Sequence, residues 1–263
     1  MAPASGSGCC GDCCERDAVR LGIIDHSSFP AANLTRQPST TSSSHVQPVK
    51  LLPRDRCQQA LFLIFLAFFA GSCVKPPYLQ FLLMQHVPTI LAALLLGHLS
   101  NRFPIGRLSF ASIILFLMLH TLGARYLYSY VPYDAWSERL LGFNITETFG
   151  FRRNHYDRLV HFSYGFLLAI PIQEFERRYF KLSVALSSVL AIECILATSA
   201  GYELLEWLVA VIFTPEWADS FLGQQGDIFD GQKDTALATV GAILSISVLA
   251  VVNRWRRRPA ESV

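Results

Sequence analysis

The sequence predicts an all-α protein, a polytopic bundle of transmembrane helices, and three observations predict it. Of the 263 residues, 52% are hydrophobic and only 16% are charged, and the mean hydropathy is positive. Several apolar runs approach or exceed the roughly 20 residues that a helix needs to cross a bilayer core about 30 Å thick. The basic residues are spread over the connections between these runs, so no nucleic-acid partner is indicated.

Six apolar runs are predicted to form membrane-spanning helices. They cover residues 58–74, 79–97, 105–123, 158–173, 182–213 and 235–253. The fifth run has 32 residues and would extend about 48 Å as a helix. It must therefore tilt, kink near Gly201 or project beyond the bilayer. A split of this run into two crossings is the main alternative topology.

Six crossings place both termini on one side of the membrane, and the basic residues indicate which side. Lysine and arginine are enriched in cytoplasmic loops, and they cluster in the segments on the side of the termini, such as 50–56, 177–181 and 254–258. Both termini are therefore predicted to be cytoplasmic. The connection 124–157 on the opposite side is also basic, which weakens this bias.

The ends of the chain differ in composition from the apolar middle. Residues 1–50 are polar and contain "PSTTSSSH", which predicts a disordered cytoplasmic extension. Its "CCGDCC" motif (Cys9, Cys10, Cys13 and Cys14) could bind a soft metal, be palmitoylated or stay reduced. Residues 55–255 are predicted to form the transmembrane domain, and residues 256–263 a short basic tail.

Polar residues from distant parts of the chain are expected to meet at the extracytoplasmic face. Three groups have helical spacing, so the side chains within each group share a helix face. They are the pair Asp157 and His161, the pair Glu203 and Glu206, and the triplet Asp227, Asp230 and Asp234. If these faces point to a common centre, seven ionisable groups share one site.

Carboxylates crowded in this way repel each other unless a cation, an arginine or shared protons offset the repulsion. The nearby bases are Arg125, Arg153, Arg158 and Lys233. A divalent metal is the other candidate, because imidazole with carboxylate suits Zn²⁺ or Mn²⁺ and carboxylates alone suit Mg²⁺ or Ca²⁺. The alternative is structural, since acidic residues at the start of a helix complement its dipole near the lipid headgroups.

Four segments together resemble the YjdF-like inner-membrane proteins, a family of unknown function. They are "LHTLGARYLYSYVP" (119–132), "RRNHYDRLVHFSYGF" (152–166), "GYELLEW" (201–207) and "GDIFDGQKD" (226–234). The resemblance covers about residues 55–255 and implies a multi-pass protein of the inner membrane. It also implies a polar signature at His120, Tyr126, Tyr128, Arg153, Asn154, Asp157, Arg158, His161, Glu203, Glu206, Asp227, Asp230 and Asp234. A looser similarity links the chain to VanZ-like membrane proteins, although Asp234 stands where those proteins tend to have Asn.

Three functions are compatible with this pattern. The first is a cation-dependent enzyme that acts on a lipid or lipid-linked substrate. In this hypothesis the catalytic residues are His161, Asp157, Glu203 and Glu206; the substrate-binding residues are Arg153, Arg158, His120 and Tyr128; and the metal ligands are Asp227, Asp230 and Asp234. The second is an ion-coupled transporter, with Glu193 in mid-membrane on the ion path. The third is a non-catalytic scaffold held together by salt bridges.

Overall fold

The computed structural model describes residues 52–53, 55–212 and 225–256, and this part of the chain is all-helical, without strands. The predicted extension 1–50 lies outside the described residues, as does the predicted tail 256–263 apart from the backbone of its first residue. The described helices are α2 (Arg56–Ser72), α3 (Leu79–Arg102), α4 (Arg107–Arg125), α5 (Tyr133–Leu141), α6 (Ile145–Phe149), α7 (Tyr156–Tyr179), α8 (Val184–Ile212) and α10 (Asp230–Arg256).

Four of these helices, α3, α4, α8 and α10, are long and apolar enough to cross a membrane. Helix α2 is apolar but has 17 residues, and α7 has 24 residues but is less apolar. Helix α8 runs through Gly201 without interruption. The alternative in which residues 182–213 form two crossings is therefore wrong, because the described part of this run, up to Ile212, is a single helix.

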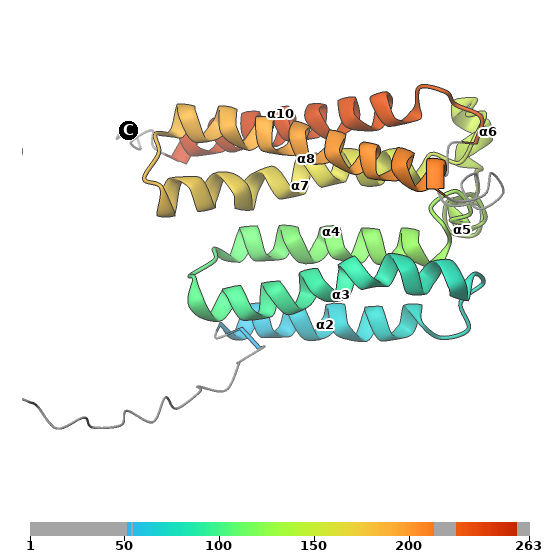
Figure 1. Cartoon of the computed structure of the whole chain (residues 1–263), viewed down its shortest axis with the longest axis horizontal. Helices are drawn as coiled ribbons and strands as arrows, with labels where there is room; N and C mark the ends of the chain where they lie inside the picture. Colours follow the sequence, from blue (N-terminus) through green and yellow to red (C-terminus); the bar gives the residue numbers. More distant parts are fainter. Residues whose placement is uncertain (1–51, 54, 213–224, 257–263) are drawn as a thin grey trace, which may run out of the picture. The chain divides into compact units, whose positions relative to one another are not determined.

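The long helices form two groups of three (Figure 1). The first helical group contains α2, α3 and α4, and the second contains α7, α8 and α10. Helix α4 packs along α7 and joins the groups, while the short helices α5 and α6 lie at the end where α4 leads into α7. The chain segments that carry the predicted polar residues all reach this end.

Small residues allow the helices of the second group to approach closely. A Cβ atom on Gly165 of α7 would lie 1.7 Å from the carbonyl oxygen of Ala238, and one on Gly241 of α10 would lie 2.2 Å from that of Phe162. No side chain fits at either distance, so the two backbones are in direct contact. This contact brings the first turns of α7 and α10 side by side.

Polar contacts hold α4 at both of its ends. At its start, the carboxylate of Glu174 in α7 accepts hydrogen bonds from the Gly106 backbone N–H (2.8 Å) and from the Ser109 hydroxyl. At its end, the Arg125 guanidinium donates to the backbone carbonyls of Ser72 and Val74. Arg125 therefore fixes the turn between α2 and α3 through bonds to backbone carbonyls.

Asn154, just before α7, links three segments of the chain. Its backbone N–H donates to Oε1 of Gln225 (2.9 Å), and its carbonyl accepts from Nε2 of the same side chain. Its own side chain donates to the Val131 carbonyl (2.9 Å) and accepts from the Tyr156 N–H. The start of α7 is thereby joined to the segment after α4 and to the segment before α10.

Candidate functional site

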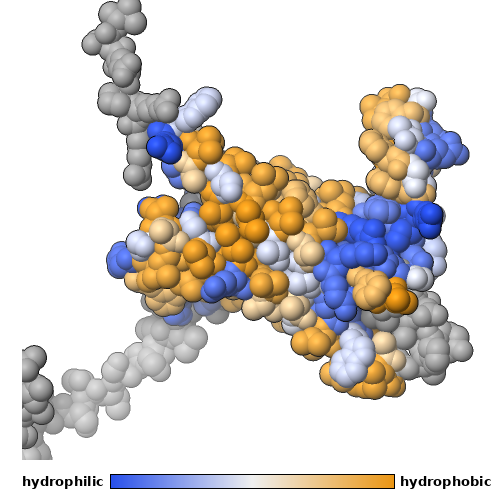
Figure 2. Space-filling model, turned by 90° about the horizontal axis from the view of Figure 1, so that it is seen from above, coloured by the Kyte–Doolittle hydropathy of each residue, from blue (hydrophilic) through white to orange (hydrophobic). Residues whose placement is uncertain are grey.

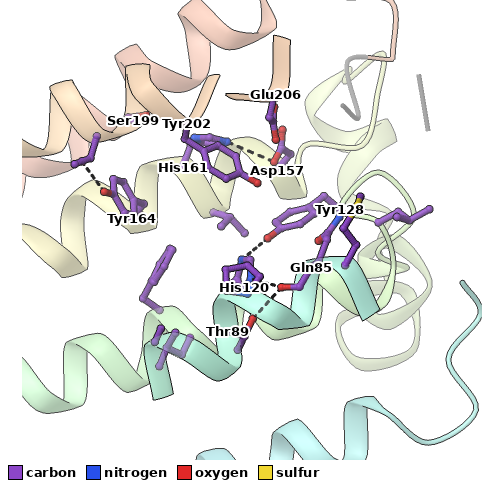
Figure 3. Close-up of a pocket in the computed structure, with 18 residues that line it drawn as sticks. Gln85, Thr89, His120, Tyr128, Asp157, His161, Tyr164, Ser199, Tyr202 and Glu206 are labelled. Atoms are coloured by element: carbon purple, nitrogen blue, oxygen red, sulfur yellow. Dashed lines mark hydrogen bonds and ion pairs between the residues drawn. The ribbon is translucent and has the colours of Figure 1, made fainter. Parts of the chain in front are cut away.

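A pocket of about 370 Å³ lies between the two helical groups (Figure 3). Helices α3 and α4 form one wall, and α7 and α8 form the other. Part of the lining is apolar, including Pro88, Phe116, Leu117 and Val160. The polar lining residues are Gln85, Thr89, His120, Tyr128, Asp157, His161, Tyr164, Thr198, Ser199, Tyr202 and Glu206. A concave pocket in which polar groups converge beside apolar surface is typical of a ligand site.

Tyr128 is held at the pocket by an unusual backbone conformation. Both Leu127 and Tyr128 have positive φ angles (53° and 55°), which are uncommon for residues other than glycine. The Tyr128 ring lies against Gly123, where a Cβ atom would come within 2.5 Å of it. Strain of this kind persists only where the surrounding structure enforces it, and it clusters at functional sites.

Tyr128 in turn orients His120. Burial raises the pKa of Tyr128, so its hydroxyl stays protonated, and it donates to Nδ1 of His120 in the tautomer whose Nε2 carries the proton. In the neutral imidazole the other nitrogen then carries the proton, and Nε2 lies 3.4 Å from the carbonyl oxygen of Gln85. Residues from the first helical group and from the turn after α4 thus form one connected wall of the pocket.

Asp157 and His161 of the opposite wall form a cluster with Asp234 of α10, which lies beside the pocket, and we call it the acid–histidine cluster. One ligand atom from each of these residues lies within 4.8 Å of those of the other two. Nε2 of His161 is also 3.7 Å from Asp157 Oδ1 and 3.6 Å from Glu203 Oε1. Ligand atoms around a tetrahedral Zn²⁺ lie roughly 3.3 Å apart, so these side chains would have to move closer together to coordinate one ion.

Two carboxylate oxygens of this region have no hydrogen-bond partner in the described part of the chain. Asp234 Oδ1 and Glu203 Oε1 are buried without a hydrogen-bond partner within the described part of the chain, and Asp234 is only 2% exposed. Buried polar atoms are normally paired.

The other two predicted metal ligands are instead engaged by bases. Asp230 pairs with Arg153, and both side chains are buried, at 5% and 7% exposure. Asp227 pairs with Arg158 and with Lys233. The hydrogen bond from Lys233 is the main reason why the pKa of Asp227 falls to about 2.

The predicted triplet therefore does not share one helix face. Helix α10 begins at Asp230, and Asp227 precedes it, following a turn in which Gln225 and Gly226 have positive φ angles. Only Asp234 reaches the acid–histidine cluster. The helical spacing did not place Asp227 correctly, because the spacing rule applies only within a continuous helix.

The remaining predicted residues have varied positions. His120, Tyr128 and Glu206 line the pocket, whereas Arg153 and Arg158 do not. Glu193 is exposed on α8 and also lies outside the pocket lining. His86, in α3, hydrogen-bonds to the Ser72 hydroxyl (3.0 Å).

Sequence reasoning missed several residues of the pocket. Ser199 and Tyr202 lie on α8 at i and i+3 relative to each other, and Glu206 is at i+7 from Ser199. This spacing could have extended the predicted glutamate face towards the middle of the helix. Gln85 and Thr89 are four residues apart on α3 and could have been recognised as a polar stripe in an apolar run.

Comparison with known proteins decides the family. The family model described as "Predicted membrane protein (DUF2238)" matches residues 57–255. The chain belongs to this family. It is 34% identical over 169 residues to the inner membrane protein YjdF of Escherichia coli (strain K12), a match that covers 64% of this chain and 77% of that protein. No solved structure matches the chain. The predicted resemblance to YjdF-like membrane proteins is confirmed.

Proposed function

We propose that this protein is a cation-dependent membrane enzyme that acts on the polar headgroup of a lipid or lipid-linked substrate. One observation carries the proposal: the ligand atoms of Asp157, His161 and Asp234 lie within 4.8 Å of one another beside the pocket. It is supported by two buried carboxylate oxygens, Asp234 Oδ1 and Glu203 Oε1, which have no hydrogen-bond partner within the described residues. Imidazole with carboxylates favours Zn²⁺ or Mn²⁺ as the ion.

In this proposal the residues at the pocket have different roles. A divalent ion at the acid–histidine cluster would polarise a phosphoryl or acyl oxygen, or lower the pKa of a bound water. Glu206 borders the pocket and is the candidate general base, while Glu203 contacts His161 and would orient it. His120 and Tyr128 face the substrate from the opposite wall.

Arg153 and Arg158 receive a different role from the one predicted. Each is ion-paired with an aspartate near the start of α10, so in the proposal they position that helix and do not bind the headgroup. The predicted ligands Asp227 and Asp230 become their partners, and Asp234 alone of the triplet contacts the ion.

The proposed topology has six crossings, made by α2, α3, α4, α7, α8 and α10. Residues 55–255 then form one transmembrane domain in the inner membrane, with both termini in the cytoplasm. The basic residues near the termini support this orientation. The acid–histidine cluster and the pocket mouth would face the extracytoplasmic side.

Metal content tests the function. Purified full-length protein is stripped with a chelator, incubated separately with Zn²⁺ and Mn²⁺, desalted and analysed for bound metal. We expect about one ion per chain in the wild type and loss of that ion in Asp234→Asn and His161→Gln. Asp227→Asn is the matched control and should retain the ion, because Asp227 pairs with bases outside the cluster.

The result is interpreted only for variants that remain folded, as judged by a cooperative thermal transition. If the wild type retains neither ion, and neither ion raises its transition temperature, the cation-dependent function is wrong. Equal retention by Asp227→Asn and both cluster variants would place the ion elsewhere and also contradict the proposal.

A further inference from the structure

A second hollow lies on a different surface of the second helical group. It is a groove of about 620 Å³ between the outward sides of α7 and α10. Arg158, Lys233 and His155 line one end, and Leu159, Phe162 and Val240 line much of the rest. None of its lining residues belongs to the pocket at the acid–histidine cluster.

The basic end of the groove carries a net positive charge. Arg158 and Lys233 share the aspartate Asp227. Arg158 also lies 3.5 Å from Asp230, whose other partner is Arg153, so three bases face two carboxylates here. Lys233 remains half exposed, and Nε of Arg158 has no hydrogen-bond partner among the described residues.

The apolar part of the groove follows both helices away from this basic end. From Lys233 to Val240 is seven residues, or roughly 10 Å of helix. Leu159 and Val240 are 49% and 54% exposed. Both side chains are apolar and cannot form hydrogen bonds. On the face seen in Figure 2, hydrophilic residues gather at the end where α5 and α6 lie, and hydrophobic residues cover much of the remainder.

We propose that the groove between α7 and α10 binds an anionic phospholipid. The lipid phosphate contacts Arg158 and Lys233, and one acyl chain lies over Leu159, Phe162 and Val240. Basic side chains at the membrane surface attract anionic lipids by about 1 kcal/mol each. A free anion would leave the apolar surface uncovered, and a zwitterionic headgroup would gain less from the positive charge. This site is independent of the proposed enzymatic function.

Thermal stability tests the proposal in the full-length protein. The protein is purified in a neutral detergent and titrated with phosphatidylglycerol, with phosphatidylcholine of the same acyl chains, or with inorganic phosphate. We expect only phosphatidylglycerol to raise the transition temperature substantially, because a ligand that binds the folded state stabilises it. Lys233→Gln should weaken the apparent affinity about fivefold, the equivalent of one surface charge.

Two further variants separate the charge from the groove. Val240→Trp fills the apolar part and leaves every charge in place, so it should abolish the lipid effect. Arg254→Gln removes an exposed base near the other end of α10 and should leave the effect unchanged.

Three results would overturn the proposal: equal shifts with phosphatidylglycerol and phosphatidylcholine, an equal shift with inorganic phosphate, or an undiminished effect in Val240→Trp. Loss of metal from Asp234→Asn would not bear on this test, since Asp234 lies outside the groove lining.

Discussion

The two helical groups pack in different ways. The core of the first group is built on large side chains, with Phe62, Phe65 and Phe110 each at most 5% exposed. The core of the second is built largely on alanines, such as Ala191, Ala238 and Ala242, all fully buried. Large residues hold helices apart, whereas small ones let the backbones approach.

The two groups also differ in how far an ion pair in each is exposed to solvent. The ion pair of the first group, Arg107 with Asp55, is exposed to solvent on the arginine side at 73%. The pair Arg153 and Asp230 in the second group is almost completely buried. A buried pair is tolerated only where geometry is excellent, and closely packed backbones provide such geometry. The comparison indicates that the second group is the rigid frame for the carboxylates and that the first supplies a pocket wall without acidic side chains.

The largest expected effect comes from breaking the close approach of α7 and α10. Gly165→Val places a side chain where the Ala238 carbonyl oxygen lies, so we expect the variant to give no cooperative thermal transition. Gly71→Val in the first group is the matched control, because a Cβ atom there meets nothing within 4 Å. A folded Gly165→Val protein, with a transition temperature near that of the control, would contradict the difference in packing.

A smaller effect is expected from the buried ion pair. Asp230→Asn removes the carboxylate that faces Arg153, and loss of one partner of a buried pair costs up to about 3 to 5 kcal/mol. The corresponding change in the first group, Asp55→Asn, should alter stability only slightly because its partner is exposed. Chemical unfolding of both variants in detergent measures the difference. Equal losses of unfolding free energy in the two variants would show that burial does not increase the contribution of the ion pair to stability.

The smallest effect concerns pH. The pKa of Asp227 is lowered to about 2 in the folded protein, against about 3.9 in an unfolded chain. The folded state therefore binds fewer protons, and the stabilisation by Asp227 is complete above about pH 4 and is lost as the pH falls towards 2. The difference in transition temperature between wild type and Asp227→Asn should shrink over this interval. A difference that grows on acidification would contradict the assigned ion pairs.

Much of the fold could be predicted from the sequence, since each long apolar run coincides with a helix. The number of crossings remains a prediction, because α2 is short and α7 is less apolar than the other long helices. Spacing could pair Asp157 with His161 and Glu203 with Glu206, since each pair lies within a continuous helix. The separation of Asp227 from Asp234 could not, because it depends on where α10 begins and on the turn at Gly226.

The pocket was also beyond prediction from local patterns. Gln85 and Tyr128 reach it from α3 and from the turn after α4, and that placement depends on how the two helical groups pack. The spacing of residues along α3 or along the turn after α4 does not indicate which helices will lie on the other side of the pocket.

The bonds of Asn154 have a mechanical consequence. One residue connects the segment that carries Tyr128 to the helix that carries Asp157 and His161 and to the approach to Asp234. Its backbone N–H and C=O bind Gln225, and its side-chain amide binds Val131 and Tyr156, so all three points are tied to the same residue. The wall that would face a substrate and the side chains that would hold an ion are thus connected through one residue, and a substitution at Asn154 would loosen both.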